Sequence, residues 1–180
     1  MGGSAAHADP AAELPAALHA LDATLVLQGP DGERLVAAAD FFQGPFTTAR
    51  RSSELLTAVR LPAPAVGARH GFHEVARRHG DFALAGAAVV VAPGTPGAPG
   101  RQARIALFGV APCAFRAAAA EAALAAGAPV AEVAALAAAA ADPHDDVHAT
   151  ANYRRAAARI CVLRALAAAG IGPGAAESAR

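Results

Sequence analysis

The sequence predicts an α+β fold, in which an antiparallel sheet is covered by helices from the end of the chain. Short apolar runs bounded by Gly- and Pro-containing turns recur up to residue 110, as expected for successive strands. From residue 116 onward the chain is rich in Ala and is interrupted by single Gly or Pro residues, as expected for short helices. The 180 residues suffice for one moderate domain or two small ones.

The N-terminal segment is expected to combine a flexible stretch with a short helix. Residues 1–8 are small and near a terminus, so flexibility is expected there. Asp9 followed by Pro10, and then Pro15, offer helix starts, with Asp9 as the N-cap of the first. We expect a helix over residues 15–20.

A hairpin comes next. The turn sequence at residues 29–32 separates two strand-like runs at 23–28 and 33–37. Residues 40–45 are expected to form a short turn packed by two Phe residues. The alternating pattern at 57–62 predicts one more strand.

Three further strands are expected to form the antiparallel sheet. They cover residues 71–76, 85–92 and 103–110. A surface loop is expected at 62–67, and a flexible loop rich in Pro and Gly at 93–100.

Three helices should complete the fold, over residues 116–126, 130–141 and 149–169. A disordered tail is expected at 171–180. Helical spacing in the third helix predicts a basic side with Asn152, Arg155 and Arg159, and an apolar side with Ala156, Ile160 and Leu163.

The composition and the absence of certain motifs argue against several classes of function for this chain. The 15 basic and 15 acidic residues cancel, which gives no electrostatic reason to expect nucleic acid or an anionic membrane as partner. We expect neither a signal peptide nor a membrane span, and we expect a cytoplasmic protein. Cys113 and Cys161 match no metal-site spacing and should be small buried hydrophobes. The sequence holds no P-loop, dinucleotide-binding glycine triplet, zinc motif or nucleophile elbow, so it does not read as a self-contained enzyme.

Gly2, Gly3 and Ser4 form the first candidate site. Adjacent glycines allow close approach of the backbone to a phosphate, and their amides can bind an anion. The alternative is a flexible terminus. His7 lies close by, and like His73 it is either a polar surface residue or a base.

Two loops are further candidates. Residues 76–83 could place Asp81 and Phe82 beside a ligand, or they could form a hairpin loop with solvated charges and Phe82 in the core. Residues 142–148 are dense in Asp and His. They could bind a metal, but a helix-linking loop with Asp142 or Asp146 as a cap is favoured.

In their order along the chain, these segments resemble the FAD-binding medium subunit of the carbon monoxide dehydrogenase and xanthine dehydrogenase (molybdenum hydroxylase) family. Residues 2–15 resemble the second of that family's two flavin loops. Six later segments follow in the family's order and spacing: Phe41-Phe42, residues 44–48, 54–62, 76–83 and 109–112, and Tyr153-Arg154-Arg155.

The resemblance implies an α+β chain in two parts. Residues 1–65 would be the second half of a two-part FAD-binding domain, and residues 66–170 a C-terminal domain of antiparallel sheet covered by helices. Such subunits carry FAD and receive electrons from a molybdenum cofactor (large) subunit through an iron-sulfur (small) subunit. They pass the electrons to NAD, a quinone or oxygen. A hetero-oligomer is therefore implied.

The resemblance also implies site residues. Gly2, Gly3 and Ser4 match the loop that contacts the FAD pyrophosphate, and His7 matches a polar contact position nearby.

Nearer the flavin, Glu13 matches an acidic position. Leu55 and Leu56 match a backbone and apolar contact to the ring or its surroundings. Asp81 and Phe82 match a loop that borders the ring, with a buried carboxylate and an aromatic.

The family's first flavin loop does not occur in this sequence, which predicts weak or no FAD retention by this chain alone. The alternative function is a non-catalytic remnant or docking module that no longer binds FAD. An unrelated Ala-rich domain would require the ordered motifs to have arisen by chance.

Overall fold

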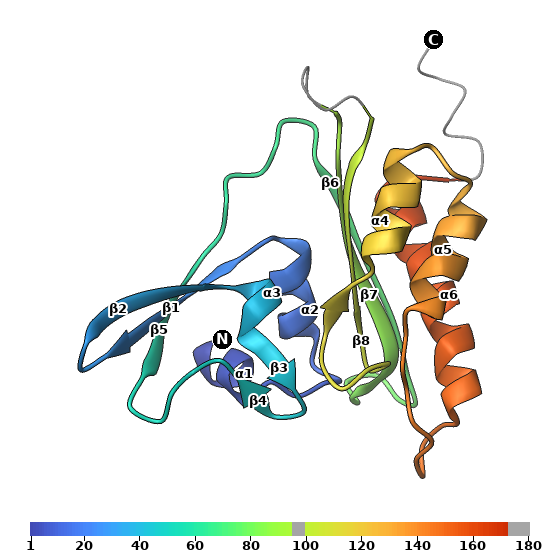
Figure 1. Cartoon of the computed structure of the whole chain (residues 1–180). Coiled ribbons are helices and arrows are strands. Elements are labelled where there is room, and N and C mark those ends of the chain that lie inside the picture. The colour runs from blue at the N-terminus through green and yellow to red at the C-terminus, as the bar shows by residue number, and fades with distance from the viewer. Residues whose placement is uncertain (95–99, 173–180) are drawn as a thin grey trace.

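The structure is a computed structural model, and it describes residues 1–94 and 100–172. Its N-terminal part begins with two helices that lead into a small sheet (Figure 1). The helices and strands in this part are α1 (Gly2–His7), α2 (Glu13–Ala20), β1 (Thr24–Gly29), β2 (Gly32–Ala37), α3 (Ala38–Phe41), β3 (Phe42–Gly44), β4 (Thr47–Thr48) and β5 (Leu55–Arg60).

Strand β1 lies between β2 and β5 in an antiparallel sheet of order β2-β1-β5. The predicted hairpin is therefore present and gains a third strand. The expectation of a flexible N-terminus was wrong, because residues 2–7 form α1, which buries Ala5 against the apolar cluster beneath the sheet. The expected turn at 40–45 contains the end of α3 and all of β3. Asp9 is not the cap of α2, whose N-cap is Ala12; its carboxylate instead accepts a hydrogen bond from the Ala11 amide.

The C-terminal part is a four-stranded antiparallel sheet of order β6-β7-β8-β9. Its strands are β6 (Arg69–Ala76), β7 (Ala83–Ala92), β8 (Gln102–Phe108) and β9 (Phe115–Arg116). Helices α4 (Ala118–Ala125), α5 (Val130–Ala139) and α6 (Ala151–Ala168) lie on one side of this sheet, and α2 lies on the other (Figure 1). The predicted α+β class is thus confirmed.

Strand β7 is almost entirely buried because it has helices on both faces. This explains its continuous run of small apolar residues, which does not alternate with polar ones. Gly86 in its centre makes room for an aromatic ring, since a Cβ there would lie 2.1 Å from Phe108 Cζ. Ring stacking then continues from Phe108 to Phe72 on β6, with centroids 5.7 Å apart.

The predicted apolar side of α6 was wrong for Ala156 and Ile160, whereas Leu163 packs against the main core. Ile160 is 41% exposed, and the helix instead buries Ala157, Ala158, Cys161 and Val162. Two neighbours set this rotation, because α6 packs both on the sheet and against α5.

Ile171 was placed in the expected disordered tail, but it is buried in the main core. Residues 173–180 and 95–99 lie outside the described part of the chain, so the expectations for the rest of the tail and for the middle of the 93–100 loop are not addressed. Cys161 is buried as expected, and burial raises the pKa of its thiol to about 12. Cys113 is only half-buried.

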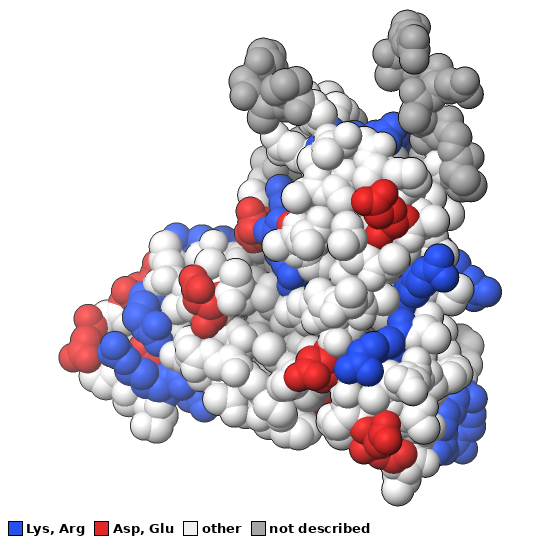
Figure 2. Space-filling model, turned by 45° about the vertical axis from the view of Figure 1, so that its right-hand side comes forward, with Lys and Arg blue, Asp and Glu red and all other residues white. Residues whose placement is uncertain are grey.

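Charges are scattered on the helical side of the molecule. Figure 2 shows small separate patches of both signs on a mostly uncharged face, in keeping with the formal net charge of zero. In the part of the chain that the structure describes, no helix has both the length and the apolar character needed to cross a bilayer.

Glu54 forms an ion pair that connects the residue before β5 to strand β2. Its side chain is 6% exposed and binds the Arg34 guanidinium through both oxygens, at 3.0 and 2.7 Å. It also accepts a hydrogen bond from the Arg51 amide at 2.7 Å. The Arg34 hydrogen bonds are the main reason that the pKa of Glu54 falls to about 2.

We therefore expect Glu54 to make stability depend on acidity. Its carboxyl pKa is lower in the folded than in the unfolded chain, so its contribution is complete above the ordinary value of about 4.3 and is lost as pH falls towards about 2. Thermal unfolding followed between pH 6 and pH 2 should show a smaller acid-induced fall for Glu54→Gln than for the unsubstituted chain. Equal falls would contradict this role.

Candidate functional site

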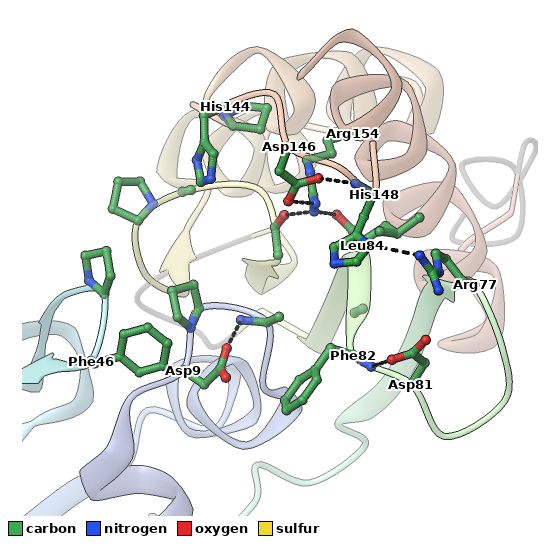
Figure 3. Close-up of a pocket in the computed structure, with 18 residues that line it drawn as sticks. Asp9, Phe46, Arg77, Asp81, Phe82, Leu84, His144, Asp146, His148 and Arg154 are labelled. Carbon is green, nitrogen blue, oxygen red and sulfur yellow. Dashed lines mark hydrogen bonds and ion pairs between the residues drawn. The ribbon is translucent and has the colours of Figure 1, made fainter. Parts of the chain in front are cut away.

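A cavity of about 480 Å³ opens between the two parts of the chain (Figure 3). Phe46, Asp9 and Phe82 lie along one side of it, and Asp146 and Arg154 along the other. Backbone hydrogen bonds hold the first side in place, with the Gly109 amide donating to Pro10 O at 2.8 Å and the Phe46 amide donating to Ala8 O at 3.1 Å.

Arg154 is a buried polar residue in the wall of this cavity. Its guanidinium donates to Asp146 Oδ2 at 2.6 Å, to Leu84 O at 2.7 Å and to Gly109 O at 3.0 Å. Arg154 is 8% exposed, so the first turn of α6 is fixed to the ends of β7 and β8. The Arg therefore serves the architecture of the cavity, since three acceptors already engage it.

The Asp- and His-rich segment at residues 142–148 forms part of the rim of the large cavity. The amides of Ala149 and His148 donate to Asp146 Oδ1, and together with Arg154 they hold the pKa of Asp146 below its ordinary value, with the Ala149 contact contributing most. The N-cap of α6 is Thr150, which corrects the expectation of Asp142 or Asp146. Among residues 1–94 and 100–172, no three His, Cys, Asp or Glu side chains are grouped as metal ligands.

Asp81 and Phe82 stand at the turn between β6 and β7. Phe82 is 65% exposed, so the alternative of a core Phe was wrong. Asp81 is not a buried carboxylate either, because its side chain is 32% exposed and lies 3.7 Å from the Arg78 guanidinium. Both residues border the large cavity in Figure 3.

These two residues also line a second, smaller cavity of about 240 Å³ together with Glu13 and Glu74. Glu74 was not predicted. Its Oε2 is buried without a hydrogen-bond partner in the described residues. Burial, and to a lesser extent the Glu13 carboxylate, raise the pKa of Glu74. Strand β6 shows no regular alternation of buried and exposed residues, so no local signal marks Glu74.

The start of α1 lies beside β5. The first amides of a helix have no partner within it, so those of Gly2, Gly3 and Ser4 are available as donors. A Cβ on Gly3 would meet nothing within 4 Å, whereas one on Gly2 would lie 3.8 Å from Leu56 O. Leu55 beside it is 71% exposed.

Known protein families match both parts of the chain. Residues 1–64 match the FAD binding domain in molybdopterin dehydrogenase, and residues 70–169 match the CO dehydrogenase flavoprotein C-terminal domain. The chain belongs to the CO dehydrogenase flavoprotein family.

Individual relatives agree with this family. Over 91 residues the chain is 45% identical to the carbon monoxide dehydrogenase medium chain of Afipia carboxidovorans, and 43% identical to the glyceraldehyde dehydrogenase medium chain of Sulfolobus acidocaldarius. Each alignment covers 51% of this chain and 32% of the relative.

Solved structures match over most of the chain. The CO dehydrogenase of Hydrogenophaga pseudoflava matches with a TM-score of 0.87 at 41% identity, covering 94% of this chain and 60% of that one. The quinoline 2-oxidoreductase of Pseudomonas putida matches with a TM-score of 0.82 at 34% identity, with the same coverage. The chain thus spans about 60% of the length of the matched chain in each of these two structures.

The structure brings most of the predicted cofactor-binding residues together in two groups. The helix-start group consists of Gly2, Gly3, Ser4, Leu55 and Leu56. The second group consists of Glu13, Asp81 and Phe82, which line the smaller cavity.

His7 belongs to neither group. Its ring packs on Phe46 with centroids 4.9 Å apart, at the edge of the large cavity. Phe46 was not singled out from the sequence, although it has a positive φ of 53° and is 59% exposed. An exposed aromatic residue with a strained backbone makes Phe46 a candidate for contact with a ligand.

The residues present fit FAD as the cofactor of this family. Exposed amides and the open space at Gly3 suit a pyrophosphate. The orphaned Glu74 oxygen and the exposed Phe82 ring beside one cavity suit a planar ring with polar edges.

Proposed function

We propose that this chain forms part of the FAD-carrying medium subunit of a molybdenum hydroxylase. In that role it receives electrons from iron-sulfur clusters and passes them to an external acceptor. The observation that carries the proposal is the pair of family matches over residues 1–64 and 70–169, in which the predicted residues form two compact groups.

The two groups have different tasks in this proposal. The amides of Gly2, Gly3 and Ser4 bind the pyrophosphate of FAD, and Leu55 and Leu56 border the cofactor beside them. Glu13, Asp81 and Phe82 border the flavin ring. FAD, when bound, supplies a ring that accepts and returns electrons. The protein orients that ring and limits the access of water to it.

The proposed partners follow from the same assignment. The small iron-sulfur subunit supplies electrons and the large molybdenum subunit oxidises the substrate, so substrate choice resides outside this chain. The proposed compartment is the cytoplasm. The half-exposed rings of Phe46 and Phe82 are consistent with a surface that a cofactor or another subunit covers.

Binding of FAD should be saturable but reversible. With the residues present, we expect added FAD to be bound in a titration and to be lost during gel filtration. Gly3→Ala should weaken binding by about tenfold through obstruction of the amides, equivalent to losing about 1.4 kcal/mol. The fold should be unchanged, because the added Cβ meets nothing within 4 Å.

Gly172→Ala is the matched control, since a Cβ there also meets nothing within 4 Å. Equal weakening by both substitutions would contradict the phosphate role of Gly3. Absence of saturable binding, combined with stable association with the partner subunits, would instead support the docking-module alternative.

A further inference from the structure

The large cavity of about 480 Å³ is not used by the proposed FAD site, although it adjoins that site. Asp81 and Phe82 line both this cavity and the smaller one. A molecule in the large cavity would therefore lie beside the flavin ring that we place at the smaller cavity. The volume is ordinary for a small-molecule site, so the large cavity has the size and the position of a second ligand site.

Aromatic and proline side chains give this cavity an apolar wall. Phe46 is 59% exposed and Phe82 is 65% exposed, so both rings can contact a ligand (Figure 3). Proline lacks an amide N–H and brings no backbone donor to a site. The prolines of the wall are Pro10, Pro45, Pro112 and Pro143. Such a wall suits a flat and largely apolar molecule.

The charged side chains of the wall disfavour an anionic ligand. Three carboxylates, those of Asp9, Asp81 and Asp146, line the cavity together with two guanidinium groups, those of Arg77 and Arg154. Both guanidinium groups are engaged, Arg154 by its three acceptors and Arg77 by a histidine. An anion would therefore meet an excess of negative charge and have to compete for both cations.

Backbone amides of the wall are engaged as well. Those of Gly109 and Phe46 donate to backbone carbonyl oxygens at 2.8 and 3.1 Å, and that of Phe82 donates to Asp81 Oδ1 at 3.0 Å. Pyrophosphate groups bind through cations or through free amides of this kind. These contacts favour an uncharged ligand over a dinucleotide.

His148 brings one hydrogen-bond donor to the cavity. The Arg77 guanidinium lies 2.9 Å from His148 Nδ1, and a guanidinium has only donors, so Nδ1 accepts and the neutral ring carries its proton on Nε2. In Figure 3 the contact with Arg77 leads away from Phe46. His148 is an exposed residue of the cavity wall, and its Nε2 contacts no other described residue, so this N–H remains for a ligand. His144 also lines the cavity, but within the described residues no contact fixes the place of its proton.

We propose that the large cavity binds an uncharged quinone as the external electron acceptor. His148 Nε2–H donates to one carbonyl oxygen of the quinone, and the rings of Phe46 and Phe82 contact its face. This inference rests on the proposed function and names the class of acceptor for it. Two electrons and two protons pass from the reduced flavin to the quinone, which becomes the hydroquinone as the flavin is reoxidised. His148 keeps its own proton and positions the carbonyl oxygen for this exchange.

The test measures binding of duroquinone to the 180-residue chain without flavin. The ring of duroquinone is fully methylated, so it does not add to the free thiols of Cys113 and Cys161. An NMR titration should show saturable shifts centred on Phe46, Phe82 and His148. Binding should be about three- to tenfold weaker in His148→Leu, the value of one hydrogen bond, and His148→Gln should retain most of the affinity because it keeps an N–H donor.

Three further measurements separate this role from a structural one. His70→Leu, an exposed position on β6 outside the cavity, is the control and should leave the affinity unchanged. Nitrogen-15 NMR of neutral His148 should show a bare Nδ1 and a protonated Nε2. Trolox quinone, which carries a carboxylate, should bind about tenfold more weakly than its uncharged methyl ester.

Four results would overturn the inference: no saturable binding of duroquinone, unchanged affinity in His148→Leu, a proton on His148 Nδ1, or equal binding of trolox quinone and its ester. Displacement of duroquinone by FAD would also overturn it, because the large cavity would then hold the flavin itself. A chain that binds FAD but not duroquinone keeps the proposed function and loses this inference. A chain that binds duroquinone but not FAD supports the quinone site and loses the proposed function.

Discussion

Replacing Arg154 with Met should lower the free energy of unfolding by about 3 kcal/mol, in the range for breaking a buried ion pair. The substitution leaves Asp146 Oδ2 and the carbonyl oxygens of Leu84 and Gly109 without their donor. These groups connect α6 to the sheet, so the loss should also loosen one wall of the large cavity. Urea unfolding monitored by circular dichroism measures the effect.

Arg159→Met is the matched control, because Arg159 lies on the exposed side of the same helix. It should change the unfolding free energy by less than about 0.5 kcal/mol. Arg154→Lys should recover only part of the loss, because an ammonium cannot reproduce the planar fork of donors. Equal stability of the Arg154→Met and Arg159→Met variants would show that the network adds nothing to stability.

Gly71→Ala should be at least as damaging, with a cost of about 3 kcal/mol. A Cβ at Gly71 would lie 1.9 Å from Ala165 O and 3.0 Å from Ala169 N, both of them backbone atoms of α6 and its C-terminal end. Neither can rotate away, so the helix would have to lift from β6. Thermal unfolding and the near-ultraviolet signal should both report looser packing.

The comparison for Gly71→Ala is Gly44→Ala, whose added Cβ would lie 4.0 Å from Thr47 Cβ and thus at ordinary contact distance. Its unfolding midpoint should stay close to that of the unsubstituted chain. A Gly71→Ala variant with an unchanged midpoint would mean that the close contact between β6 and α6 is not required in solution.

The sequence predicted the strands and helices of the C-terminal part because their local signals agree with their surroundings. Gly and Pro mark the ends of the Ala-rich helices, and apolar runs mark β7 and β8. The sequence did not predict the features that depend on tertiary contacts. The buried side of α6 depends on packing against both the sheet and α5, and helical spacing alone cannot choose among stripes of Ala.

The site was predictable only in part, for a similar reason. The resemblance named Glu13 and Phe82, and the fold brings both to one cavity. Glu74 and Phe46 escaped attention because nothing in their local sequence distinguishes them. The orphaned oxygen of Glu74 and the ring contact between Phe46 and His7 arise from segments far apart in the chain.

The most direct test of the central claim is amide NMR of the chain during titration with FAD. Binding at the proposed site predicts shifts in both groups, at Gly2, Gly3, Ser4 and Leu56 and at Glu13, Asp81 and Phe82. ADP should shift only the first of these groups, and riboflavin only the second. Shifts confined to other surfaces, or none at saturating FAD, would contradict the assignment of this chain as a flavin carrier.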